Sequence, residues 1–163
     1  MKESMGMHGR LQLQVVDRQG RVVQEQRCQN RIVTGGRQLV AQLFGGVSGG
    51  TPPGRVTHMA VGTNPVAPAD DQTGLGTERS PRKPITEVTY SEFDEAAPGG
   101  NVRRVRASLR AVFDFNEANG PEPLREAGIF TAETGGVMYN RVVFDPVTKT
   151  NAFNLTLLWD ITF

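Results

Sequence analysis

A chain of 163 residues with 37% hydrophobic and 21% charged residues has the size and composition of one globular domain, which buries roughly 70% of its unfolded surface. The formal net charge of +1 gives no overall electrostatic argument for a nucleic-acid or anionic-membrane partner. The single cysteine, Cys28, excludes an intrachain disulfide framework and fits a reducing cytoplasm, and no apolar run reaches the roughly 20 residues of a membrane helix.

The first predicted element is a β-hairpin. In RLQLQVV, the apolar Leu11, Leu13 and Val15 alternate with other residues, which is the period of a strand with one buried face. DRQG predicts a turn that Asp17 opens and Gly20 closes, and RVVQEQRC predicts the returning strand. The residues before the hairpin, about 1–9, are expected to form a mobile arm that can order on a partner.

A short helix follows, within NRIVTGGRQLVAQLFGG. Leu39, Val40, Leu43 and Phe44 recur at helical spacing and form one apolar stripe, and the pair Gly45-Gly46 predicts where the helix stops. After a glycine- and proline-rich loop, RVTHMAVGT predicts a strand.

The segment from Asn64 to Pro84 is predicted to be a long proline-rich loop. Connections longer than roughly 12–15 residues are uncommon in compact domains and are often functional or flexible. Proline lowers the entropy that such a loop loses on docking. Adjacent carboxylates at Asp70 and Asp71 would help to bind calcium, although turn chemistry explains such pairs more often. The candidate subunit-contact residues of this loop are Asn64, Pro65, Asp70, Asp71, Leu75 and Pro81.

The second half of the chain predicts further strands at short spacing, in ITEVTYSEF, VRRVRASLRAVFDF, LREAGIF, VMYNRVVFDPV and LTLLWDITF. In the last of these, Leu155, Leu157, Trp159, Ile161 and Phe163 fall on one face, which predicts a core strand. The whole chain is therefore predicted to be one all-β domain over residues 1–163. We expect a mainly antiparallel β-sandwich or barrel-like fold of about seven to eight strands with one short α-helix.

The sharpest electrostatic feature is the polar face of VRRVRASLRAVFDF. Arg104, Arg106 and Arg110 lie on this face and would form a basic stripe for a phosphate backbone. Stacking aromatics, which a binder of single-stranded nucleic acid needs, are missing from the same face. The alternatives are a solvated face or a face paired with a neighbouring subunit through Glu87 or Glu126. These three arginines are therefore candidate subunit-contact residues, and no direct nucleic-acid partner is expected.

Residue patterns for catalysis or metal binding are weak. Cys28 and His58 would in principle form a nucleophile pair, but a half-buried thiol and an unrelated strand histidine explain them better. One cysteine and two histidines give no zinc spacing, and the glycine pairs form neither a Walker loop nor a dinucleotide fingerprint. The prediction is a protein that is not an enzyme, with no catalytic, cofactor-binding or metal residues and no cofactor.

Several motifs stand in a particular order between Asn30 and Phe163. NRIVTGGRQLVAQLFGG is followed by RVTHMAVGTN, by PVAPADDQTGLGTE running on to RSPRKPI, by LREAGIFTAETGGVMYNRVVFD, and by a closing LTLLWDITF. This order resembles that of small structural proteins of tailed bacteriophages and related contractile phage-tail-like particles, among tail, fibre-attachment and other virion components. Structural roles for the motif residues agree with this resemblance. Glu126 is expected to accept backbone hydrogen bonds at the start of a strand, and Gly135 and Gly136 are expected to supply positive φ in a hairpin turn.

The resemblance implies a virion protein without catalytic residues, located in a virion or phage-tail-like particle that is assembled in the bacterial cytoplasm. We expect a structural subunit of the tail, baseplate or fibre base that contacts other copies of itself, as a homo-oligomer, and other particle subunits. Membrane insertion is not expected. A capsid decoration or head-stabilising protein and a glycan-binding receptor-recognition module are the alternatives. For the second, Tyr90 and Tyr139 are the available aromatics, because Trp159 falls on the buried face of its strand.

Overall fold

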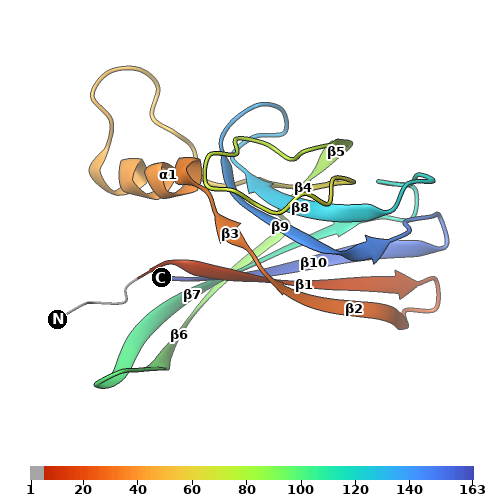
Figure 1. Ribbon diagram of the computed structural model, residues 1–163, viewed down its shortest axis with the longest axis horizontal. Helices are drawn as coiled ribbons and strands as arrows, with labels where there is room; N and C mark the ends of the chain where they lie inside the picture. The colour runs from red at the N-terminus through yellow and green to blue at the C-terminus, as the bar shows by residue number, and fades with distance from the viewer. Residues whose placement is uncertain (1–5) are drawn as a thin grey trace.

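Residues 6–163, which the computed structural model describes apart from the side chain of Ser80, form two five-stranded antiparallel sheets and one helix (Figure 1). The strand order is β2-β1-β10-β7-β6 in sheet A and β3-β9-β8-β4-β5 in sheet B. The predicted antiparallel sandwich with one short helix is confirmed. The bounds of the elements are β1 (His8–Asp17), β2 (Val22–Gln29), β3 (Arg31–Ile32), α1 (Thr34–Gly45), β4 (His58–Gly62), β5 (Glu78–Pro84), β6 (Glu87–Ala97), β7 (Gly100–Phe113), β8 (Leu124–Phe130), β9 (Met138–Val147) and β10 (Phe153–Thr162).

The centre of sheet A joins the two ends of the described chain. β1 pairs with β10 along its whole length, from His8 opposite Thr162 to Asp17 opposite Phe153. The inward residues of β10 are buried as predicted, and fully burying each large apolar side chain contributes roughly 1.5–3 kcal/mol. Trp159 lies among them with no exposed surface, and its Nε1 donates a hydrogen bond to Asn30 Oδ1 at 2.6 Å.

Phe163 departs from this pattern. It follows the last residue of β10 and is 43% exposed, so the prediction that it shares the buried face is wrong. The alternation continues to the last residue, but an open cleft, which Phe163 helps to line, lies over this end of the strand.

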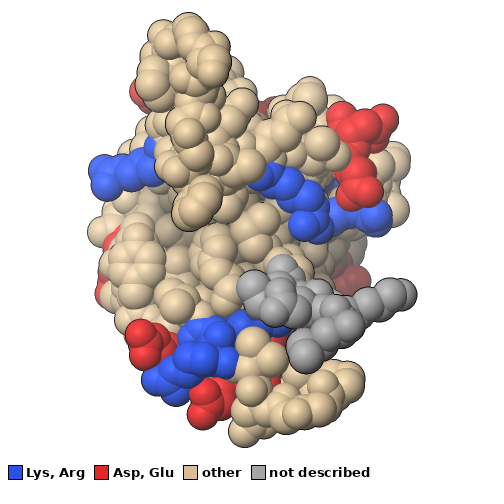
Figure 2. All heavy atoms as spheres, turned by 90° about the vertical axis from the view of Figure 1, so that its left-hand side faces the viewer, with Lys and Arg blue, Asp and Glu red and all other residues tan. Residues whose placement is uncertain are grey.

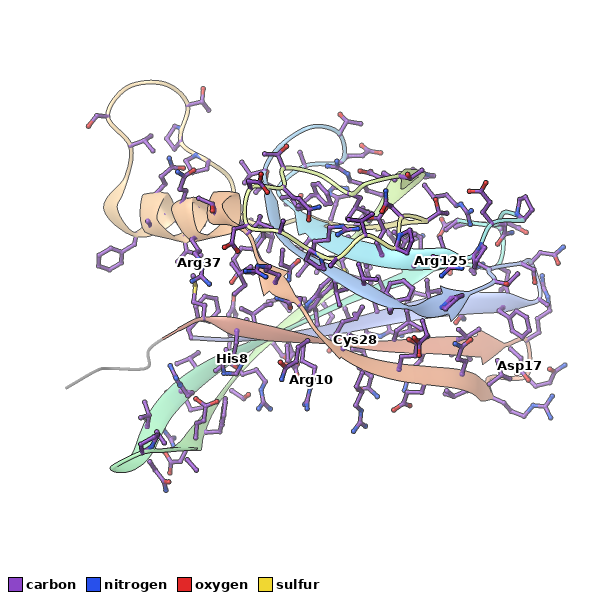
Figure 3. All side chains as sticks on the ribbon, viewed as in Figure 1. His8, Arg10, Asp17, Cys28, Arg37 and Arg125 are labelled. Atoms are coloured by element: carbon purple, nitrogen blue, oxygen red, sulfur yellow. The ribbon has the colours of Figure 1, made fainter. Side chains whose placement is uncertain are left out.

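The N-terminal hairpin forms as predicted. The backbone N–H groups of Gln19 and Arg21 each donate to Asp17 Oδ1 at 2.9 Å, and Gly20 has a φ of 80°. The hydrogen bond from the Arg21 backbone is the main reason that the pKa of Asp17 is lowered. Figure 3 shows Asp17 at this turn and His8 at the far end of β1. Of the predicted mobile arm, residues 1–5 lie outside the described residues, whereas residues 8 and 9 belong to β1.

The helix α1 also forms where the apolar stripe predicts it, and Gly46, with a φ of 77°, ends it by donating its N–H to the Gln42 carbonyl at 2.8 Å. Its stripe is only partly covered by the sheets. Leu39 is buried, whereas Leu43 is 52% exposed and Phe44 is 95% exposed. The C-terminal half of the helix therefore projects an apolar edge into solvent.

The predicted long loop is shorter than expected, because Glu78–Pro84 form strand β5. This strand lies at the edge of sheet B, so one of its two sides has no partner strand. Proline lacks an N–H group, and on that open side no hydrogen bond to a neighbouring strand is lost. The other unpredicted strand is the two-residue β3, and together these two account for the excess over the seven or eight expected strands.

The two sheets differ in extent. β7 has 14 residues and β6 has 11, whereas β4 has 5 and β8 has 7. The β6–β7 hairpin consequently projects beyond the sandwich at the lower left of Figure 1. Val88, Tyr90 and Val105, which the pleat assigns to the core side of this hairpin, are 44%, 75% and 43% exposed. One end of sheet A thus presents a core-type face without a covering layer.

Candidate functional site

A cleft of about 400 Å³ opens where α1 lies opposite the start of β6. One wall comes from α1 and the segment 55–57, and the other from residues 85–90. Buried core side chains form the floor, among them Tyr139, whose pKa is raised by burial. The apolar residues that line the cleft are Leu39, Val40, Leu43, Val56, Ile85, Val88, Tyr90, Ala107, Leu109, Ile129, Tyr139, Ile161 and Phe163.

Figure 2 views the molecule from this end. The surface between the loop after α1, at the top, and the β6–β7 hairpin, at the bottom, is mainly uncharged, and coloured charged groups gather around its margin. Arg55 and Glu87 are the charged residues among those lining the cleft. An apolar hollow with a charged margin suits the binding of an apolar side chain or chain segment more than that of a polar small molecule.

The predicted arginine face is largely occupied within the chain. Arg104 is 6% exposed, and its Nε donates to Glu95 Oε2 at 2.7 Å, which is the largest contribution to the lowered pKa of Glu95. The guanidinium of Arg106 lies 4.3 Å from the centre of the Phe93 ring. Both partners lie on β6, which pairs with β7 along the hairpin. The alternation of β7 alone does not reveal these partners.

Arg110 lies on the outer face of sheet A, where it lines a polar hollow of about 260 Å³ together with Ser108 and Asp160. Ser108 Oγ donates to Asp160 Oδ1 at 2.6 Å. Arg10 also lines this hollow, and Figure 3 shows it pointing away from sheet B. Arg110 therefore lies at an outer polar surface, as does Arg106, which lines a second polar hollow of about 430 Å³. The residue opposite Arg110 on β6 is Glu87.

The segment between β4 and β5 is held by a buried ion pair. Arg141 Nε lies 2.8 Å from Glu126 Oε2, and neither side chain is exposed. The Glu126 carboxylate also accepts the backbone N–H groups of Asn64, Gly76 and Thr77 at 2.8–3.1 Å. The prediction that Glu126 accepts backbone bonds is confirmed, and its proposed pairing with a neighbouring subunit is excluded by its burial.

Arg141 binds the same segment from the other side. Its guanidinium donates to the carbonyls of Asn64 and Val66 at 3.2 and 2.6 Å. A side chain at Gly62 would overlap the carbonyl of Thr77, so this glycine makes room for the closure of the loop. The loop is consequently tied at both ends to β8 and β9, in contrast to the flexible loop that its length allows.

The predicted contact residues of this segment have different surroundings. Asp70 accepts a hydrogen bond from Arg31 Nε at 2.7 Å, which lowers the pKa of Asp70. The carboxylate that the sequence offered as a calcium ligand is therefore already paired with an arginine. Leu75 is partly buried against the small cluster that contains Phe130. Asn64 is half-buried, whereas the remaining three residues are exposed: Pro65, Asp71 and, in β5, Pro81.

The fold does not bring together Cys28 and His58, which would in principle form a nucleophile pair. Cys28 lies on β2 of sheet A and His58 on β4 of sheet B, where the His58 ring nitrogen Nδ1 is 2.8 Å from Thr57 Oγ1. Burial raises the pKa of the Cys28 thiol, which disfavours the thiolate. Within residues 6–163, no group of three or more His, Cys, Asp or Glu side chains is arranged to hold a metal ion. The 12-residue α1, the one helix of that range, falls short of a membrane span.

Sequence patterns also missed a buried lysine. Lys149 has no exposed surface, and its ammonium donates to Asn119 Oδ1 and to the carbonyls of Asp114, Phe115 and Thr150. Burial lowers its pKa to about 8. The Lys149 ammonium therefore holds the loop between β7 and β8 in place. The polar sequence TKTN predicts a turn, but it does not indicate that its lysine is buried.

Comparisons with protein-family models, with curated proteins and with solved structures give no match for this chain. The apolar cleft is the surface feature that the sequence patterns did not single out. The one signal for it was the position of Phe44, at the end of an amphipathic stripe and directly before the Gly45-Gly46 stop.

Proposed function

We propose that this chain is a non-enzymatic structural subunit of a phage or phage-tail-like particle. It would lie on the tail, the baseplate or the fibre base and act through contacts with copies of itself and with other subunits. The observation that carries the proposal is the apolar cleft with its exposed walls, because large exposed apolar patches on folded proteins mark interaction sites.

Two further features support a role in assembly. The segment between β4 and β5 is fixed to the core by Glu126 and Arg141, so its exposed residues lose little conformational entropy when they contact a partner. The ordered motifs from Asn30 to Phe163 resemble those of small structural proteins of such particles. Both features fit a scaffold whose surface is built for contact.

The proposal is tested in the organism that carries the gene. Particles are purified on a density gradient, probed with an antibody against this chain, and imaged after immunogold labelling. We expect the chain to co-purify with particles and the gold to lie at the tail or its base. Label on the head would support the capsid-decoration alternative, and absence of the chain from purified particles would reject a particle role.

Glycan recognition has one observation in its favour, the 75% exposure of Tyr90 beside the cleft. Exposed aromatic rings are suited to packing on sugar faces. A glycan array with the wild-type chain and a Tyr90→Ala variant separates this alternative, because binding that depends on Tyr90 would support it. No binding at high protein concentration would remove it.

A further inference from the structure

Of the nine large apolar side chains that are exposed within residues 6–163, five lie at or beside the cleft. Leu43 and Phe44 project from α1, Val88 and Tyr90 from β6, and Phe163 follows β10. All except Phe44 line the cleft, and Phe44 follows the lining residue Val40 by one helical turn, on the same side of α1. The face therefore carries both a projecting aromatic ring and an apolar hollow.

The area of this face is compatible with a specific interface. Phe44, Tyr90 and Phe163 are 95%, 75% and 43% exposed. Since an aromatic side chain buries about 150–250 Å² when it packs, these three alone offer roughly 400 Å². One partner in a standard interface contributes about 800 Å², so these aromatics supply about half of that before the aliphatic walls are added.

The arrangement is self-complementary. A head-to-tail ring requires a projection on one face of a subunit and a matching hollow on a different face. Here the projecting Phe44 and the hollow lie side by side on the same face. A two-fold axis through this face would place each Phe44 against the hollow of the other copy and would satisfy both at once.

We propose that this face binds the same face of a second copy of the chain, with Phe44 of each copy entering the cleft of the other. Pairing of the isolated chain does not require a place in a particle. The solution test below and the localisation test of the proposed function can therefore fail independently.

The test measures mass in solution. Sedimentation equilibrium of the full chain, at concentrations up to about 0.1 mM, should give twice the chain mass. Phe44→Asp and Tyr90→Asp should each raise the dimer dissociation constant at least about thirty-fold, the effect typical of a central aromatic. Val23→Asp is the matched control, because Val23 is 53% exposed on β2, outside the cleft, and this variant should remain dimeric. Circular dichroism checks that each variant is folded.

A monomeric wild type would overturn the proposal and leave a different protein as the occupant of the cleft. A ring of three or more copies, a dimer unchanged by Phe44→Asp, or equal dissociation of the Val23→Asp control would also overturn it.

Discussion

Glu126 and Arg141 form an ion pair at 2.8 Å in which neither side chain reaches solvent, and together they hold the backbone of a segment that begins 62 residues earlier in the chain. The pair therefore connects β8 and β9 with both ends of the segment between β4 and β5. Removing one member leaves the other as a buried charge without compensation.

Arg141→Met should consequently lower the free energy of unfolding by about 3–5 kcal/mol, measured by urea denaturation. The double variant Glu126→Gln with Arg141→Met should lose less than the sum of the two single variants, because no unpaired charge remains. Arg31→Met is the control, since its partner Asp70 is exposed, and it should change the midpoint little. An effect of Arg141→Met no larger than that of the control would contradict the assigned importance of the pair.

The C-terminal segment allows a contrast between two aromatic residues, Trp159 within β10 and Phe163 directly after it. Trp159→Ala should lower the free energy of unfolding by about 3–5 kcal/mol, because Trp159 has no exposed surface at the centre of sheet A. Deleting residues 159–163 should abolish soluble folded protein. Deleting Phe163 alone should be tolerated, since its side chain is 43% exposed, although its backbone bonds to Val105 are lost. A soluble product with an unchanged melting temperature after the five-residue deletion would disprove the core position of β10.

The hairpin β6–β7 allows a test of the arginine face. Arg104→Glu should reduce the urea midpoint of the monomer, because it places a like charge against Glu95 at a position that is 6% exposed. Arg103→Glu is the matched control: the Arg103 side chain is 60% exposed and should matter less. Adding Glu95→Arg to Arg104→Glu should recover part of the loss. Equal midpoints for Arg104→Glu and Arg103→Glu would show that Arg104 lies on a solvated face.

Cys28 gives a prediction on pH. Burial raises the pKa of this thiol above that of an unfolded chain, and the thiolate is the reactive form. The reaction with a thiol-specific disulfide reagent should therefore be slower in the native protein than in urea, and its pH–rate midpoint should lie higher. A native midpoint equal to or below the denatured one would contradict the half-buried environment of Cys28.

The spacing of apolar residues predicted most of the fold, because the secondary structure of a segment depends largely on residues that are close in sequence. The hairpin turn at Asp17, the helix and the burial of Trp159 all follow from local spacing. β5 was missed because Pro81 indicates a loop unless the strand is known to lie at an edge, which depends on topology. Phe163 was assigned wrongly for a similar reason, since alternation does not tell where the opposing layer ends.

Partnerships between distant side chains were the least predictable part of the candidate site. The partner of Arg104 is fixed by the register of β6 on β7. Apart from the carbonyl of Thr150, the acceptors of Lys149 come from a loop 30–35 residues earlier. The expectation that Glu126 accepts backbone bonds was correct, but the buried Arg141 beside it required the pairing of β8 with β9. The cleft could not be predicted because it arises from the unequal extents of the two sheets.

The pairing of β1 with β10 also constrains how the polypeptide acquires its fold during synthesis. Residues 8–17 find their central partner only among residues 153–162, so sheet A cannot close until β10 has left the ribosome. Throughout translation the nascent N-terminal hairpin keeps one edge open to other chains, and a truncated product would retain that open edge.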